Sequence, residues 1–223
     1  MKRPLALLLL ASMLAACGTP APRPPEWRGV ANAALADYIK QRLEGHAPAA
    51  ARAYTLAQER MRDGGDLDGL HTVLLTRCAM DVALLLATDC NEFVQRNASA
   101  RAEALAYHAL LTGTLTQQQL AMLPERYRAL GTAWLNNGPM AQAAIAISDP
   151  LSRLIASGIA ARADRADDTL FAAVSDAARA QGWRAAHRAH ESARIRLLDA
   201  QGRTAAAAAL RARLQALYGT TAP

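Results

Sequence analysis

Apolar residues recur at helical spacing through most of the chain. Trp27, Ala31, Ala34 and Tyr38 stand at i, i+4, i+7 and i+11, and this stripe predicts a first helix that ends near Gly45. Similar stripes follow, each separated from the next by glycine, proline or a capping residue. Further boundaries are expected at Pro48, Gly64-Gly65, Asp66, a Thr116/Gln119 capping box, Pro124, Asn137-Gly138-Pro139 and Ser148-Asp149-Pro150, with final helices over 167–181, 184–200 and 204–218.

Composition supports an all-α fold. Alanine, the best helix former, makes up about a quarter of the residues, and only 4% are aromatic. Short turns make consecutive helices antiparallel, and alanine lets their axes approach closely. The sequence therefore predicts an array or irregular bundle of about ten antiparallel helices.

The last two expected helices carry a family resemblance. With Gly202 in the turn and Ala207 early in the second helix, the pair resembles a tetratricopeptide repeat, although Ile195 and Arg211 depart from that pattern. The family stacks helical hairpins and binds partner proteins and peptides in a concave groove. The resemblance implies a similar hairpin and a similar use.

The N-terminus has the pattern of a secretory signal. Lys2 and Arg3 precede the apolar stretch 5–14, which is shorter than the roughly 20 residues that span a bilayer as a helix. Leu14-Ala15-Ala16-Cys17 resembles the lipobox of bacterial lipoproteins, which implies a lipidated Cys17. The alternative is an ordinary signal peptidase site, at which Cys17 carries no lipid.

This pattern divides the chain into a signal peptide over 1–16, a lipidated cysteine with a proline-rich tether over 17–26, and a single all-helical domain over 27–219. Because Gly18, not Asp, follows the cysteine, the lipoprotein resemblance implies the periplasmic face of the outer membrane. Two or three acyl chains would hold the protein firmly, since each buried methylene contributes about 0.8 kcal/mol.

The body of the chain contains two more cysteines, Cys78 and Cys90. An oxidising compartment favours a disulfide between them, but a continuous helix would separate their Cα atoms by about 18 Å. Either the helix breaks near Asp81 to allow a bridge, or both are inert core thiols. We expect the bridge.

Positive charge is concentrated at the C-terminal end. The formal net charge is +6, yet residues 17–150 hold 12 basic and 13 acidic side chains, whereas 151–223 hold 11 and 6. A solvated arginine face explains this, and the alternative is a docking patch for an acidic partner; nucleic acid is excluded by export and by the lack of interleaved aromatics. The candidate patch residues are Arg184, Arg188, Arg194, Arg211 and Arg213.

Few residues suggest chemistry. The chain has no phosphate-binding loop, no His-Glu-x-x-His motif and no Cys-x-x-Cys motif, so we expect no cofactor and no metal. Asp66 to Gly69 matches only a fragment of a calcium loop, and helix capping explains it better. His187, His190 and Glu191 are expected to be surface polar residues. Glu191-Ser192 resembles the catalytic dipeptide of soluble lytic transglycosylases, but the segment that follows it in that family is missing.

These features favour a non-enzymatic role. The first hypothesis is an outer-membrane-anchored helical lipoprotein that serves as a scaffold or assembly factor for envelope proteins. The alternative is an envelope hydrolase, or a regulator of cell-wall hydrolysis, whose catalytic groups are scattered along the sequence.

Overall fold

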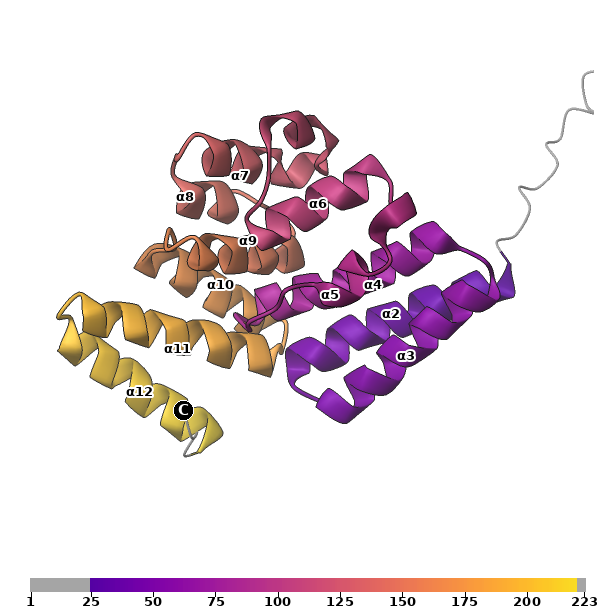
Figure 1. The fold of residues 1–223 in the computed structure, drawn as a ribbon. Coiled ribbons are helices and arrows are strands. Elements are labelled where there is room, and N and C mark those ends of the chain that lie inside the picture. Colours follow the sequence, from indigo (N-terminus) through magenta and orange to yellow (C-terminus); the bar gives the residue numbers. More distant parts are fainter. Residues whose placement is uncertain (1–24, 220–223) are drawn as a thin grey trace, which may run out of the picture.

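The computed structural model describes residues 25–219, which are helical with no strand among them (Figure 1). This confirms the predicted all-α fold. Eleven α-helices and two short 3-10 helices follow one another. The signal peptide, Cys17 and most of the proline-rich tether lie outside the described residues.

The first two helices begin and end, and the third helix begins, where local signals predict. Helix α2 (Glu26–Glu44) ends at Gly45, whose φ of 93° suits only glycine well. Helix α3 (Ala47–Asp63) has its proline in the first turn, and α4 (Leu67–Ala83) is capped by Asp66, whose carboxylate accepts the Gly69 N–H at 2.8 Å. The capping interpretation of Asp66 is therefore confirmed.

The middle of the chain is more irregular than the sequence suggests. The Thr116/Gln119 capping box is present, but it opens a 3-10 helix, not an α-helix. Short helices over 91–94, 97–99 and 140–145 fill stretches for which the sequence predicts no separate element. The helices that start at Glu125 and Pro150 follow the predicted boundaries at Pro124 and Ser148-Asp149-Pro150. The bounds are α5 (Asn91–Val94), η1 (Asn97–Ser99), α6 (Ala102–Thr112), η2 (Gln117–Met122), α7 (Glu125–Leu135), α8 (Met140–Ile145) and α9 (Pro150–Arg162).

The final three helices match the predicted ranges closely. They are α10 (Asp168–Ala180), α11 (Arg184–Ala200) and α12 (Thr204–Tyr218), joined by turns at Gly182 and Gly202 with positive φ. The hairpins stack, and α11 returns to pack against α2 (Figure 1). Helices α4 and α9 cross at the centre of the array and contact each other.

The crossing of α4 and α9 depends on a glycine. A Cβ built on Gly158 would lie 2.1 Å from the Val82 carbonyl oxygen. The backbones can approach this closely only because the side chain is missing. The α9 residues around it are buried on all sides: Ser152, Leu154, Ile155, Ala156, Ser157, Ile159 and Ala160.

A buried histidine joins α11 to this crossing. His190 is fully buried, its Nε2–H donates to the Ala83 carbonyl at 2.9 Å, and Ser157 Oγ lies 3.4 Å from Nδ1. Burial lowers the pKa of His190 to about 4, although the Ala83 hydrogen bond opposes this shift. The imidazole is therefore neutral at physiological pH, and its side chain links α4, α9 and α11.

Substitution of Gly158 tests the helix crossing. We expect Gly158→Ala to lower the free energy of unfolding by about 3 kcal/mol, because the added methyl overlaps a backbone carbonyl. The measurement is urea denaturation followed by circular dichroism. The matched control is Gly29→Ala in α2, where a Cβ meets nothing within 4 Å and helix propensity predicts a gain of about 0.5–1 kcal/mol. Equal effects at both positions would contradict the close crossing.

Stability should also depend on the protonation of His190. Since its pKa is about 4 in the folded chain and about 6.5 when unfolded, the unfolded state binds more protons between these values. Above pH 6.5 His190 is neutral in both states, and its burial has no proton-linked cost. As the pH falls toward 4, the free energy of unfolding drops by about 3 kcal/mol in total, because the unfolded chain takes up the proton that the folded chain refuses. Denaturation series at pH 7 and pH 4.5 measure this. His190→Gln should show a shallower pH dependence, and an unchanged slope would refute the assignment.

Candidate functional site

An apolar groove of about 630 Å³ lies along α4, between α6 and the start of α7 on one side and α9 on the other. Most of its surface is contributed by aliphatic and aromatic side chains. A concave, mainly apolar site of this size with a few polar groups is the usual form of a binding pocket. Its apolar lining includes Ile39, Leu75, Ala79, Met80, Ala104, Tyr107, Pro124, Tyr127, Leu151 and Ile155.

The floor is one face of α4 that other helices leave partly uncovered. Thr72, Leu75, Thr76 and Ala79 follow at helical spacing and all line the groove. The hydroxyls of Thr72 and Thr76 each donate to the carbonyl four residues earlier, at 2.9 and 2.8 Å. The donor hydrogens of both hydroxyls are thus used within α4, and Leu75 and Ala79 supply apolar surface between them.

Two stacked tyrosines form one wall. The rings of Tyr107 in α6 and Tyr127 in α7 lie 5.4 Å apart with an interplanar angle of 25°. Burial, with a smaller contribution from Tyr127, raises the pKa of Tyr107 well above its ordinary value. Both rings pack as part of a rigid wall, and Arg126 places its guanidinium carbon 5.2 Å from the Tyr127 ring.

The rim of the groove carries five charged side chains. Asp68 and Arg101 pair at 2.5 Å, and Asp149 accepts the Ser152 N–H at 2.8 Å as the cap of α9. Glu103 has no ion pair among residues 25–219, and Arg126 lies over Tyr127. With three acids and two bases, the formal charge of the rim is −1.

His71 is a further groove residue, which the sequence analysis did not single out. It is only 2% exposed, and its Nε2–H donates to the Arg96 carbonyl at 2.8 Å. That bond leaves Nδ1 as an acceptor, which is buried without a hydrogen-bond partner among the described residues. The ring edge packs on Phe93, which is fully buried in α5.

A disulfide anchors the segment that supports His71. The structure joins Cys78 of α4 to Cys90, with their Cα atoms 5.2 Å apart. The sequence places the necessary helix break near Asp81, whereas α4 ends at Ala83 and the chain then reverses through Leu85 and Cys90, both with positive φ. The covalent link holds α5, and with it Phe93, against α4.

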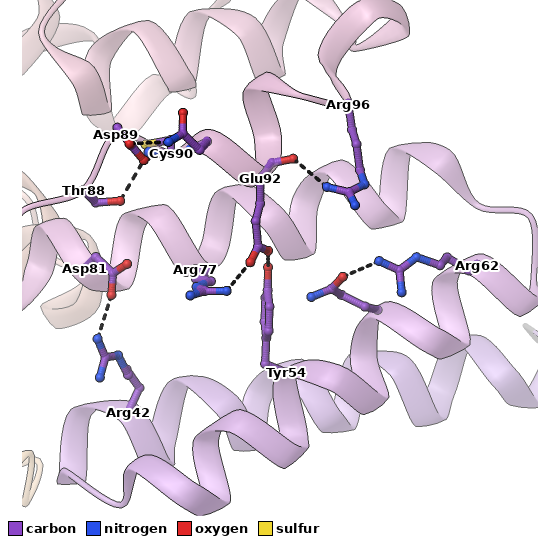
Figure 2. Close-up of polar contacts among 12 residues, drawn as sticks. Arg42, Tyr54, Arg62, Arg77, Asp81, Thr88, Asp89, Cys90, Glu92 and Arg96 are labelled. Carbon is purple, nitrogen blue, oxygen red and sulfur yellow. Dashed lines mark hydrogen bonds and ion pairs between the residues drawn. The ribbon is translucent and has the colours of Figure 1, made fainter.

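A second cluster of polar side chains lies on the other side of α4 (Figure 2). Tyr54 donates to Glu92 at 2.5 Å, and Arg77 donates to the other oxygen of the same carboxylate. Arg42 and Asp81 pair at 2.7 Å. These bonds connect α2 and α3 to α4 and α5 across a hollow of about 460 Å³. Because its charged groups already satisfy one another, this cluster acts as a brace.

The same cluster keeps two phenols neutral. Burial, followed by the charge of Asp81, raises the pKa of Tyr38 to about 12. Burial and the hydrogen bond to Glu92 also raise the pKa of Tyr54. The two rings lie 5.2 Å apart, so Tyr38 and Tyr54 pack the interface between α2 and α3.

Two of the five arginines of the predicted patch are paired with acidic side chains. Arg194 pairs with Asp168 at 2.5 Å, and Arg211 contacts Asp199. Burial raises the pKa of Asp168, but its bonds to Arg194 and Arg203 outweigh that effect and leave the pKa below its ordinary value.

The other predicted patch residues have less charge around them. Arg184 lies 3.0 Å from His46 Nε2, and the Arg188 guanidinium carbon lies 5.6 Å from the Tyr218 ring. Arg213 is exposed and makes no ion pair with the described residues. The five arginines therefore do not form one uncompensated surface.

The expectation that three polar residues of α11 lie on the surface is wrong. His187, His190 and Glu191 are 3%, 0% and 6% exposed, because α11 packs against α10 and α12 and also against α2. Glu191 lies 3.9 Å from Arg194 Nη1 and does not line the apolar groove. The sequence pattern of α11 shows one apolar face, so it does not predict that a helix packed on several sides also buries polar side chains.

The described residues contain neither a metal-type cluster nor a helix that could cross a membrane. Within residues 25–219, no group of three or more His, Cys, Asp or Glu side chains is arranged to hold a metal ion. None of the helices in the same part of the chain is both long and apolar enough to cross a membrane.

Comparisons with known protein families, with curated proteins and with solved structures found no match.

The support beneath the groove can be tested through Phe93. We expect Phe93→Ala to lower the free energy of unfolding by about 3–5 kcal/mol, because it leaves a cavity between His71 and the disulfide-anchored segment. The neighbouring Val94 is 44% exposed, so Val94→Ala should change it by less than about 0.5 kcal/mol. Urea denaturation measures both. Similar losses for the two variants would disprove the role assigned to Phe93.

Proposed function

We propose that the chain is a lipid-anchored cell-envelope protein that docks other envelope proteins. In this proposal Cys17 holds it at the periplasmic face of the outer membrane, and residues 17–26 separate the helical domain from the lipid. The lipobox over 14–17 and the prolines that follow support the anchor.

The apolar groove along α4 is the observation that supports docking. It is lined by helices that pack against one another, so a ligand meets a surface that is already shaped. Its apolar floor gives affinity by burial, while the charged rim gives orientation. The hydrolase alternative gains nothing from Glu191, which is buried beside Arg194 and away from the groove.

Site-specific photo-crosslinking in bacteria that export the full chain tests both parts. A benzoylphenylalanine replaces Thr72, which is exposed on the groove floor, or Thr132, which is exposed on α7 outside the groove. We expect a discrete crosslinked envelope protein from position 72 only. We also expect the native chain to incorporate labelled palmitate and to fractionate with the outer membrane. Cys17→Ser should do neither.

Docking through the groove and anchoring through Cys17 have separate negative outcomes. Equal crosslinking from both positions, or none from either, would overturn docking through the groove. Fractionation of Cys17→Ser with the outer membrane, together with unchanged labelling, would overturn the anchor.

A further inference from the structure

The disulfide between Cys78 and Cys90 lies beside a surface hollow of about 250 Å³. Both cysteines line this hollow, together with Thr88, Asp89 and Asn91 of the segment that follows α4. Asp89 and Asn91 are exposed to solvent, and Figure 2 shows Cys90 beside Asp89. The hollow therefore gives a small thiol a route to the disulfide in the folded chain.

Local backbone preferences do little to hold residues 84–99 in place. The helices of this segment, α5 and η1, contain four and three residues, and isolated helices of that length are unstable in water. Leu85 and Cys90 have φ of 57° and 55°, a left-handed conformation that is unfavourable for residues with a Cβ. The segment therefore depends on contacts with other helices.

These contacts come from α3, α4 and α9. They include Phe93 in the core, His71 on the Arg96 carbonyl, Tyr54 and Arg77 on Glu92, and Arg162 on the Leu86 carbonyl. The disulfide adds a covalent tie, which limits the conformations of the chain between two cysteines that are 12 residues apart. Its loss therefore favours opening of the segment.

The helix end that precedes the segment is held independently of it. The Val82 carbonyl faces Gly158 of α9, and the Ala83 carbonyl accepts the hydrogen bond from His190 of α11. Neither contact uses residues 84–99. Opening of the segment can therefore leave the crossing of α4, α9 and α11 intact.

We propose that the Cys78–Cys90 disulfide is a redox latch: reduction by a dithiol in the folded chain lets residues 84–99 open as a local unit, while the crossing of α4, α9 and α11 persists. A thiolate of the dithiol attacks one Sγ, which breaks the S–S bond and forms a mixed disulfide. The second thiol of the dithiol then attacks this mixed disulfide. The two cysteines finish as thiols, with two electrons and two protons from the dithiol, which is itself oxidised to a disulfide.

Opening of the latch would alter the groove along α4. His71 lines the groove, and its hydrogen-bond acceptor, the Arg96 carbonyl, belongs to the segment that opens. The imidazole of His71 also packs on Phe93 of the same segment. Both partners leave when the segment opens, so a side chain that is 2% exposed becomes accessible. The inference goes beyond docking and does not depend on it.

Hydrogen exchange tests the local opening. The probes are the amides of 93–96, which are hydrogen-bonded within the segment, and the full chain carries Cys17→Ser so that Cys78 and Cys90 are its remaining cysteines. We expect these amides to exchange roughly tenfold faster, or more, after reduction with dithiothreitol and in Cys78→Ala/Cys90→Ala. Their exchange should depend only weakly on urea below the unfolding transition, whereas amides of α9 should show the steep dependence of global unfolding. Unchanged exchange of 93–96, or a urea dependence equal to that of α9, would overturn the latch.

The rate of reduction tests the route through the hollow. Labelling with a maleimide counts the thiols that dithiothreitol releases. We expect the rate to be proportional to the dithiothreitol concentration and to change less than about twofold up to about 1 M urea, because no global unfolding is required. Asn91→Trp, at the hollow, should slow reduction roughly fivefold, whereas Val94→Trp, an exposed position outside it, should not. A rate that rises steeply with urea, or equal rates in the two variants, would overturn reduction of the folded chain.

Discussion

The C-terminal end of α4 is the point on which the rest of the structure depends. There the Val82 carbonyl meets Gly158 of α9, and the Ala83 carbonyl accepts a hydrogen bond from His190 of α11. The last carbonyls of a helix have no partner within it, and here a side chain 107 residues away supplies one. Because α11 also contacts α2, these two contacts close the array. The groove is therefore lined by helices whose spacing is fixed elsewhere.

The sequence predicts the helices whose ends are defined locally. Gly45, Asp66 and Gly202 mark boundaries through backbone conformation or capping, which depend only on neighbouring residues. The stretch between Leu84 and Thr116 is different. Its short helices are held by Phe93 in the core and by the bridge to Cys78, and both are tertiary contacts. For the same reason the burial of His190 could not be predicted: its partners lie on two other helices.

The polar brace and the apolar groove lie on different sides of α4, and they differ in what they offer a ligand. In the brace, Glu92 is shared by Tyr54 and Arg77, and Asp81 is paired with Arg42, so a ligand would have to break existing bonds. On the groove floor no such bonds need to be broken, and burial of apolar surface is available to a ligand. The sequence could indicate the apolar character of α4 but not the groove, because five separate segments line it.

The position of the groove relative to the start of the domain bears on how docking and anchoring would combine. Arg28, near the start of α2, pairs with Asp66 at 3.0 Å, and both line a polar hollow that shares Asp68 and Arg101 with the groove. The described chain thus begins beside one end of the groove. In a protein anchored through Cys17, the tether would attach at that end. A partner segment in the groove would then lie within the reach of the tether, about 25 Å at 3.1 Å per residue for an extended proline-rich chain. Anchoring would in this way limit docking to partners close to the membrane.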